Sequence, residues 1–440
     1  MASHAEPSAG SAPATPATAG TIPAVAVALM NLEDGVLRWV DRTGPKPVET
    51  TIAPLSVRFS DLSLTTPMHV EIDATTSGTA PTTVRIRGTV GPVGDPPFSS
   101  DVPIEQRVAV HGGAFEVGDL AITGRMRRAE SGAPIASLTL TAPKASAPGV
   151  VVEELTASAT ESDGVATLDQ LAFKVFGGTV EGKGRIDHTG PNPACAFETT
   201  VRNMDVSQAL AARAPDLAAR FEGRLDGEWS LGASAGDEAL VRRTLAGKGH
   251  TVIRAGRLRG VNIVDGVLSG VTGGAGFVTL VPQRIRGRYP DIFGTDDTRF
   301  DELASDVRVK DERILVDSFD VVARDYVVHG KGVVTFAQQV DLTATLAASA
   351  ALTGDIVGAL KQAMYLTDDG GRLAIPFRLT GVLPNVRAKP DLDFVNRVLR
   401  KALVGEGLDK LFGGGKQGND GKHPDGSKDL LRKGLDELFR

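Results

Sequence analysis

One short pattern recurs along this chain, and the recurrence limits the fold more than any other feature of the sequence. Each copy has a β-type run, a tight turn and a second β-type run that carries the tripeptide Gly-Lys-Gly. The tripeptide occurs at residues 182–184, 247–249 and 330–332. The copies around the first and last tripeptides, residues 171–187 and 319–336, are the most alike. Such units predict a mainly β protein with many antiparallel strands.

The second run of each unit has two unlike faces. In the first copy Val180 and Ile186 share one face with two glycines, while Lys183 and Arg185 share the other. In the last copy one face takes Tyr326, Val328, Gly330, Gly332, Val334 and Phe336. Antiparallel sheets with one solvated face have this alternation. We therefore expect a sheet with one apolar face, notched by glycine at the centre of each unit.

The region before the repeats also has the pattern of strands. Residues 25–29 and 36–40 are predicted to form two strands joined by a hairpin turn at residues 33–35. Asp-Gly between two apolar runs is a strong hairpin signal. Residues 84–90 alternate with period two, which predicts a further strand with one polar face.

Few segments have a helical pattern. Short helices are predicted over residues 261–271 and 352–366, and a clearer one begins after Pro390. One face of that last helix is apolar and carries Leu392, Val395, Val398, Leu399 and Leu403. This face has two readings, either a cap on the end of the sheet or a helix that lies on a membrane surface.

These patterns divide the chain into five parts. They are a disordered linker (1–22), an N-terminal β segment (23–148), repeated β units (149–346), a helix with closing strands (347–389), and amphipathic C-terminal helices with a Gly-rich spacer (390–440). Residues 1–22 lack the charged start and apolar core of a signal peptide. No run of 18 or more apolar residues is present, so no membrane-spanning helix is predicted.

Motifs for catalysis or cofactor binding are not found in the sequence. The Gly-Lys-Gly tripeptides are followed by Arg185, His250 and Val333, whereas a phosphate-binding loop needs Ser or Thr there. The histidines lack the spacing of a zinc protease, and the one cysteine, Cys195, permits no internal disulfide. The net charge of −6 argues against a general nucleic-acid binder. We expect a non-enzymatic protein without metal or cofactor.

Five motifs in a fixed order resemble the C-terminal region of AsmA-like proteins, over residues 245–396. They are GRLRGVNI (256–263), TRFDEL (298–303), GKG (330–332), IPFRLTG (375–381) and PNVRAKPD (384–391). The upstream motif VFGGTVEG (175–182) resembles another unit of the same family, and residues 25–150 resemble a more degenerate part.

This resemblance implies a protein of the Gram-negative cell envelope. AsmA-like proteins are usually anchored in the inner membrane by an N-terminal helix and extend into the periplasm. Their elongated sheet curls into a groove with an apolar floor, and the implied role is to carry phospholipid between membranes and support outer-membrane assembly. The implied partners are phospholipid acyl chains, the envelope membranes and outer-membrane assembly proteins. This sequence shows no such anchor helix, so inner-membrane association would require an anchor outside it.

The resemblance and the alternation together predict which residues line the groove. They are Phe173, Val175, Val180, Ile186, Tyr326, Val328, Val334, Phe336, Leu342 and Leu346. Two other functions stay open. A structural or regulatory periplasmic scaffold would close its apolar faces into a dry core. An enzyme acting on an envelope glycan or lipid would need groups such as His250 and Asp265 to converge in a cleft.

Overall fold

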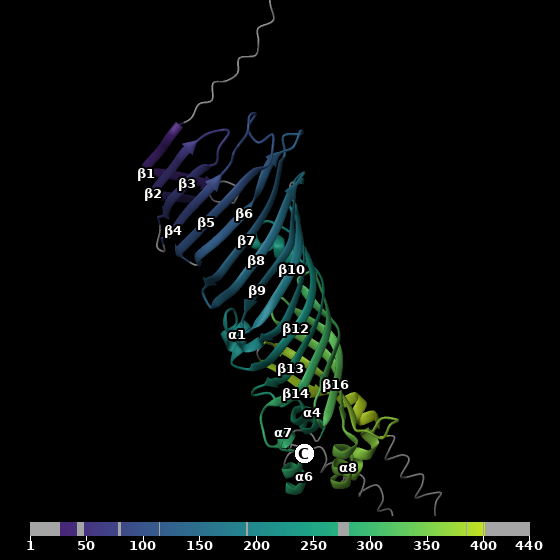
Figure 1. Ribbon diagram of the computed structural model, residues 1–440. Coiled ribbons are helices and arrows are strands. Elements are labelled where there is room, and N and C mark those ends of the chain that lie inside the picture. The colour runs from purple at the N-terminus through teal and green to yellow at the C-terminus, as the bar shows by residue number, and fades with distance from the viewer. Residues whose placement is uncertain are drawn as a thin grey trace, which may run out of the picture.

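The computed structural model describes residues 27–41, 48–77, 81–113, 115–190, 192–271, 281–383, 385–398 and 400. In this part of the chain 19 strands form one sheet. Each strand pairs antiparallel with the next strand in the sequence, from β1 (Val27–Asp41) to β19 (Asn385–Pro390). Figure 1 shows the sheet curling along its length, from β1 at one end to a group of helices at the other. The predicted mainly β, elongated and curled antiparallel sheet is confirmed.

The first half of the sheet consists of long strands joined by short turns. They continue from β1 as β2 (Val48–Leu62), β3 (Met68–Thr76), β4 (Thr82–Val90), β5 (Val102–Gly112), β6 (Glu116–Arg128), β7 (Pro134–Ala147), β8 (Val150–Ser162) and β9 (Val165–Val175). β7 and β8 pair along their length across the expected boundary between residues 148 and 149, so the sheet is continuous there.

The second half of the sheet is interrupted by helical segments. Its strands before β19 are β10 (Gly178–Asp187), β11 (Ala194–Asp205), β12 (Phe221–Ser234), β13 (Ala246–Leu258), β14 (Thr298–Lys310), β15 (Arg313–Val322), β16 (Tyr326–Thr335), β17 (Gln339–Ala348) and β18 (Ala374–Val382). The helices are α1 (Val206–Ala211), α2 (Pro215–Ala218), α3 (Glu238–Thr244), α4 (Ile263–Val271), α6 (Gln283–Arg288), α7 (Pro290–Phe293), α8 (Ala350–Ala359) and the 3₁₀ helix η1 (Lys361–Leu366).

The hairpin predicted at residues 33–35 is wrong. Residues 27–41 form the single strand β1, which pairs with β2 on both sides of Gly35. A two-residue type I′ turn needs positive φ at both central residues, but only Asp34 has it, with φ 53°. The ladder shifts register around Gly35, so the Asp-Gly pair makes a bulge in a continuous strand.

Aromatic rings fill the glycine notches of the three Gly-Lys-Gly units. Gly184, Gly249 and Gly330 lie directly opposite Phe197, Trp229 and Phe319 on adjacent strands. A Cβ atom added at these glycines would lie 2.4, 2.3 and 2.4 Å from the opposing ring. The glycines are therefore needed so that each ring can lie flat over the neighbouring backbone.

The main hydrophobic core lies where helices cover one end of the sheet. A cluster of 26 buried residues joins α4, α6, α7 and α8 to the apolar face of β13 to β18. We call these four helices, together with helical residues 392–398, the helical cap. Leu352 and Ile356 of α8 and Ile375 of β18 are each 1% exposed in this cluster. The helix predicted over 261–271 is α4 of the cap, and the one predicted over 352–366 is split between α8 of the cap and the following η1.

Candidate functional site

One face of the sheet is apolar along the strands that precede the cap. Register aligns Ile72, Ile86, Val108 and Leu120 as direct neighbours across β3 to β6. The same face continues to β9 and β10, where Phe173 lies opposite Val180. The apolar side chains of these strands therefore form a continuous floor across the sheet.

This floor is uncovered at its N-terminal end. On β1 the side chains of Met30, Leu32, Leu37 and Trp39 lie on the same face, and they are 51, 47, 46 and 64% exposed. The buried cluster of this half contains three residues, Val117, Ala142 and Ala145, among the described part of the chain. The described helices pack against β11 and later strands. We call the apolar side of β1 to β11 the open apolar face.

The predicted lining residues fall into two groups. Val175 and Val180 are buried next to the β9–β10 turn, while Phe173, Ile186, Val334, Phe336 and Leu342 are half-buried. Tyr326, Val328 and Leu346 are 5, 1 and 2% exposed inside the large cluster. At the capped end, the helices already occupy the space above the predicted lining.

The helix that follows Pro390 packs as a cap in the part that is described. Asp391 caps it, because its Oδ1 accepts a hydrogen bond from the Phe394 N–H at 3.0 Å. Val395 is 2% exposed in the main cluster and Val398 packs against that cluster, while Leu392 is 53% exposed. Leu399 and Leu403 lie outside the described residues, as do the predicted linker at 1–22 and the C-terminal spacer.

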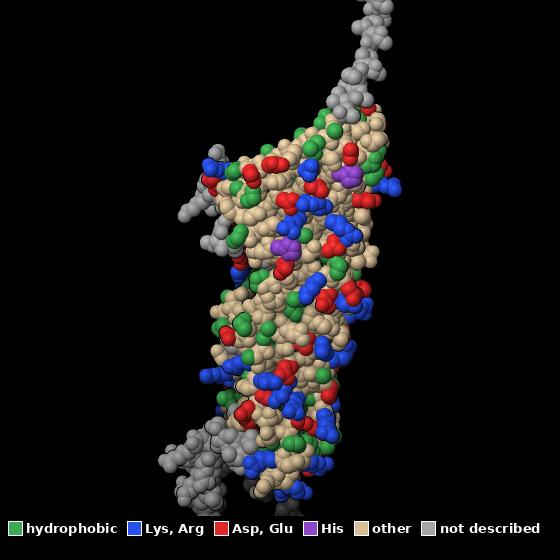
Figure 2. Space-filling view, turned by 60° about the vertical axis from the view of Figure 1, so that its left-hand side comes forward, with side chains coloured by type: hydrophobic (Ala, Val, Ile, Leu, Met, Phe, Trp, Pro, Cys, Tyr) green, Lys and Arg blue, Asp and Glu red, His purple; other side chains and the backbone are tan. Residues whose placement is uncertain are grey.

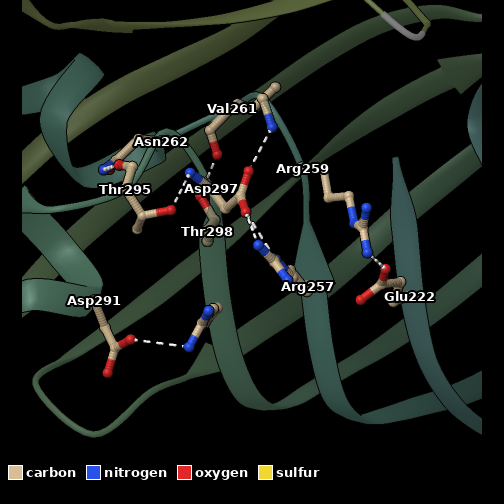
Figure 3. A network of polar contacts seen from close by, with 11 residues as sticks. Glu222, Arg257, Arg259, Val261, Asn262, Asp291, Thr295, Asp297 and Thr298 are labelled. Carbon is tan, nitrogen blue, oxygen red and sulfur yellow. Dashed lines mark hydrogen bonds and ion pairs between the residues drawn. The ribbon is translucent and has the colours of Figure 1, made fainter. Parts of the chain in front are cut away.

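A polar network holds the segment between β13 and α4, where the chain enters the helical cap (Figure 3). The Asp297 carboxylate accepts hydrogen bonds from Arg257 Nε at 2.7 Å and from the Gly260 N–H at 2.8 Å. Asn262 donates to the carbonyls of Ile292 and Thr295 at 2.6 and 2.8 Å. The Gly260 N–H and the Arg257 guanidinium hold the pKa of Asp297 below its usual value.

This network explains two of the motifs that carried the resemblance. Arg257, Gly260 and Asn262 belong to GRLRGVNI, and Thr298 opens TRFDEL. Thr298 Oγ1 donates to the Val261 carbonyl at 2.7 Å and accepts from the Ile263 N–H at 3.0 Å. These motif residues thus hold the start of α4 against β13 and β14. The contact of these motif residues with Asp297 was not predicted, because Asp297 lies 40 residues after Arg257.

The other face of the sheet is polar and carries cross-strand ion pairs. Figure 2 shows a face on which basic and acidic side chains are interleaved along the molecule. Lys183 Nζ lies 3.0 Å from a Glu198 carboxylate oxygen. Arg308 donates two hydrogen bonds to the Asp317 carboxylate, at 2.6 and 2.7 Å, in a bidentate ion pair. The Arg308 guanidinium lowers the pKa of the Asp317 carboxyl. Such pairs specify strand register more than they add stability.

His250 and Asp265, the two groups named for an enzyme, lie apart from each other. His250 Nδ1 pairs with Asp306 at 2.8 Å on the polar face, whereas Asp265 lies in α4 and accepts from Ser269 at 3.1 Å. No group of three or more His, Cys, Asp or Glu residues with metal-binding geometry occurs in this part of the chain. The described helices include none with the length and hydropathy of a membrane span.

Comparison with known proteins shows what this chain is similar to. The AsmA family model matches residues 122–314, from β6 to the start of β15. Protein AsmA of Escherichia coli K12 is 22% identical over 289 residues, which are 65% of this chain and 43% of that protein. No solved structure matches the chain. The predicted resemblance to the AsmA family is confirmed.

The match differs from the predicted resemblance in its extent. It begins well before residue 245 and ends at 314, so the motifs at 330–332, 375–381 and 384–391 lie beyond it. The chain spans less than half the length of the E. coli protein. The comparisons therefore support the resemblance to the AsmA family over part of the chain.

Proposed function

We propose that the open apolar face holds the acyl chains of phospholipids and conducts them between the inner and outer membranes, as a non-enzymatic step in outer-membrane assembly. The observation that carries this proposal is the continuous row of apolar side chains across adjacent strands, uncovered at β1. The periplasm is the compartment in which a protein with this role would work.

The apolar floor suits acyl chains because their binding needs area and no specific contact. Each buried methylene group contributes about 0.8 kcal/mol, so a chain that lies along several strands gains several kcal/mol. The floor includes half-buried side chains such as Ile72 and Ile86 and buried ones such as Val102. A lipid can therefore move from one strand to the next without breaking a polar contact.

The capped end favours a second candidate function, a structural scaffold for outer-membrane protein assembly. Its 26-residue cluster is a buried apolar core of the kind that a scaffold would have. The two functions predict different behaviour of the open face. A scaffold would bind a protein partner there or leave the face empty, whereas a lipid carrier would retain lipid through purification.

The test places a photo-crosslinking amino acid at either of two neighbouring positions in β4. Ile86 lies on the open apolar face, and Arg87 lies on the polar face, where it pairs with Asp73 at 2.7 Å. The full chain is expressed in a Gram-negative host, and crosslinked species are analysed by mass spectrometry. We expect phospholipid adducts at position 86 and none at 87.

Two results would refute lipid binding. One is equal crosslinking at positions 86 and 87, and the other is the absence of phospholipid from the purified chain in native mass spectrometry. As a further measurement, Ile86→Asp should reduce transfer of fluorescent phospholipid between vesicles, while Arg87→Asp should not. Loss of transfer in both variants would show that the apolar face is not the path.

A further inference from the structure

The two edge strands of the sheet, β19 and β1, are built differently. β19 has six residues, includes Arg387 and Lys389, and ends at Pro390. α4 packs against this strand, with Gly266 next to Ala388. Short length, charge, proline and a covering helix are features that keep an edge strand from pairing with another chain. The β19 edge is therefore protected.

The β1 edge lacks this protection. β1 has 15 residues, and within the described part of the chain it pairs with β2 alone. Its other edge presents a row of backbone N–H and C=O groups without strand partners among the described residues. Eight of the fifteen large apolar side chains that are exposed in the described residues lie in this one strand. A long, apolar edge of this kind is a site for the addition of a further strand.

Exposed apolar side chains lie on both faces of β1. Besides the four on the open apolar face, Leu29, Val36 and Val40 lie on the opposite face and are 46, 66 and 40% exposed. Acyl chains on the open apolar face would cover neither these side chains nor the backbone edge. A strand paired with β1 would cover both, since its side chains would flank those of β1 on the two faces. The occupant that this edge fits is therefore a β-strand.

The open-face residues of β1 are arranged symmetrically about Gly35. The extra residue of the bulge places Leu32 and Leu37 on one face although they are five residues apart. Each lies two strand positions from Gly35, and Met30 and Trp39 each lie four positions from it. A second copy of β1, antiparallel to the first and related to it by a two-fold axis between the two Gly35 residues, would set Leu32 beside Leu37 and Met30 beside Trp39.

The opposite face of β1 has the same symmetry. The same axis would set Leu29 beside Val40 and Asn31 beside Arg38. Arg38 contacts β2 on one side, where its Nε lies 3.0 Å from a Glu49 carboxylate oxygen, and it would meet the Asn31 side chain of the second copy on the other. An interface between the same patch on two copies must be self-complementary, whereas a strand from a different protein needs no symmetry in β1. The pattern therefore favours a second copy of this chain.

We propose that two copies of this chain pair through β1 in an antiparallel, two-fold dimer, so that their two sheets join into one. The new ladder runs over residues 28–41 of each strand and adds about ten backbone hydrogen bonds. The dimer is closed, because the strands left at its two ends are the protected β19 strands. The two open apolar faces lie on the same side of the joined sheet, since the axis is perpendicular to it. Dimerisation uses the strand edge and does not rest on lipid binding.

Paired cysteines test the register of the dimer. In a Cys195→Ser background, Asn31→Cys and Arg38→Cys chains are mixed and oxidised. Directly opposed residues of an antiparallel pair have Cα atoms about 4.5–5.5 Å apart, which a disulfide can span. We expect the mixture to form a disulfide-linked dimer and neither variant to do so alone, because like positions lie about 20 Å apart in this register. In the control, Arg58→Cys replaces Asn31→Cys and should not crosslink, since Arg58 lies beside Asn31 but in β2, one strand further from the edge.

Lysine substitutions test the interface itself. Sedimentation equilibrium of the full chain should show a monomer–dimer equilibrium with a dissociation constant below about 100 μM. Leu32→Lys with Leu37→Lys should raise this constant at least about ten-fold, because lysines would then lie directly opposite each other across the two copies. Val151→Lys with Val382→Lys replaces two apolar side chains of β8 and β18, 44 and 51% exposed, and should leave dimerisation unchanged. Circular dichroism confirms that each variant is folded.

Any of three results would overturn the proposal. They are a chain that stays monomeric at about 100 μM, crosslinking of Arg58→Cys as readily as Asn31→Cys, and equal effects of the two pairs of lysine substitutions. The cysteine variants also detect a different occupant. If the chain stays monomeric and Arg38→Cys instead forms a disulfide with another protein of the host envelope, the added strand belongs to a partner protein and the assignment to a second copy is wrong.

Discussion

The two halves of the sheet share one sequence pattern, but they differ in what covers their apolar face. Strands β1 to β9 and strands β13 to β18 both place Val, Ile and Leu on the same face. In the second half that face is buried under the helical cap, with Val328 1% exposed. In the first half it is open at the N-terminal edge, with Trp39 64% exposed. Alternation therefore creates an apolar face, but a covering element decides whether that face becomes a core or a surface.

The chain carries a reporter for each half. Its two tryptophans are Trp39 in β1 and Trp229 in β12. Single-tryptophan variants, Trp39→Phe and Trp229→Phe, would let denaturant unfolding of each half be followed separately. The following predictions use these variants and run from the largest expected effect to the smallest.

The largest difference should come from truncating apolar side chains in each half. Ile356 is 1% exposed beneath the cap, so Ile356→Ala should lower the free energy of unfolding by about 2–5 kcal/mol, as reported by Trp229. Leu37 on β1 is 46% exposed, so Leu37→Ala should change the value reported by Trp39 by less than about 0.5 kcal/mol. Urea titration measures both. Equal losses would mean that the open face is a core in solution.

A smaller effect should follow from filling a glycine notch. A Cβ at Gly330 would lie 2.4 Å from the Phe319 ring and 2.7 Å from the Thr343 carbonyl oxygen, so Gly330→Val should cost about 1–3 kcal/mol. A Cβ added at Gly118 in β6 would have no neighbouring atom within 4 Å, so Gly118→Ala should be neutral or slightly stabilising. If Gly330→Val is tolerated as well as Gly118→Ala, the ring does not need the notch.

The smallest effect concerns the network at the entry to the cap. Because the folded-state pKa of Asp297 lies below its unfolded value of 3.8, its stabilisation is present above pH 3.8 and is lost as the pH falls through the folded pKa. Asp297→Asn should therefore lower the urea midpoint near neutral pH and reduce its fall toward about pH 3. Trp229 fluorescence reports this change.

A surface ion pair provides the control for that variant. Asp119 pairs with Arg107 at 2.7 Å between β5 and β6, far from the helical cap in sequence. Asp119→Asn should change the stability by less than about 0.5 kcal/mol near neutral pH. If the Asp119 and Asp297 variants behave alike, the network does not hold the cap to the sheet.

Local patterns predicted the strands better than their connections. The tight turn predicted within residues 171–187 is a two-residue turn between Val175 and Gly178, with positive φ at both Phe176 and Gly177. The same type of signal failed at Asp34, because β2 offered a partner along the full length of β1. Turn propensity acts over a few residues, whereas a paired neighbouring strand contributes many backbone hydrogen bonds.

The candidate site was predictable in part for a similar reason. Period-two alternation placed Phe173 and Val180 on one face, and register confirms that they are neighbours. The burial of Tyr326 and Val328 under the cap was not predicted, since the covering helices are separated from them in sequence.

The sequence by itself determined the strands, the two unlike faces and the recurrence of Gly-Lys-Gly, because these follow from side-chain alternation within single strands. Only the tertiary structure decided which part of the apolar face is covered and which ring fills each notch. Those features depend on register between strands and on the docking of distant helices, such as α8 over β18. Contacts between distant segments are fixed by the whole fold, so they leave no periodic signal in the local sequence.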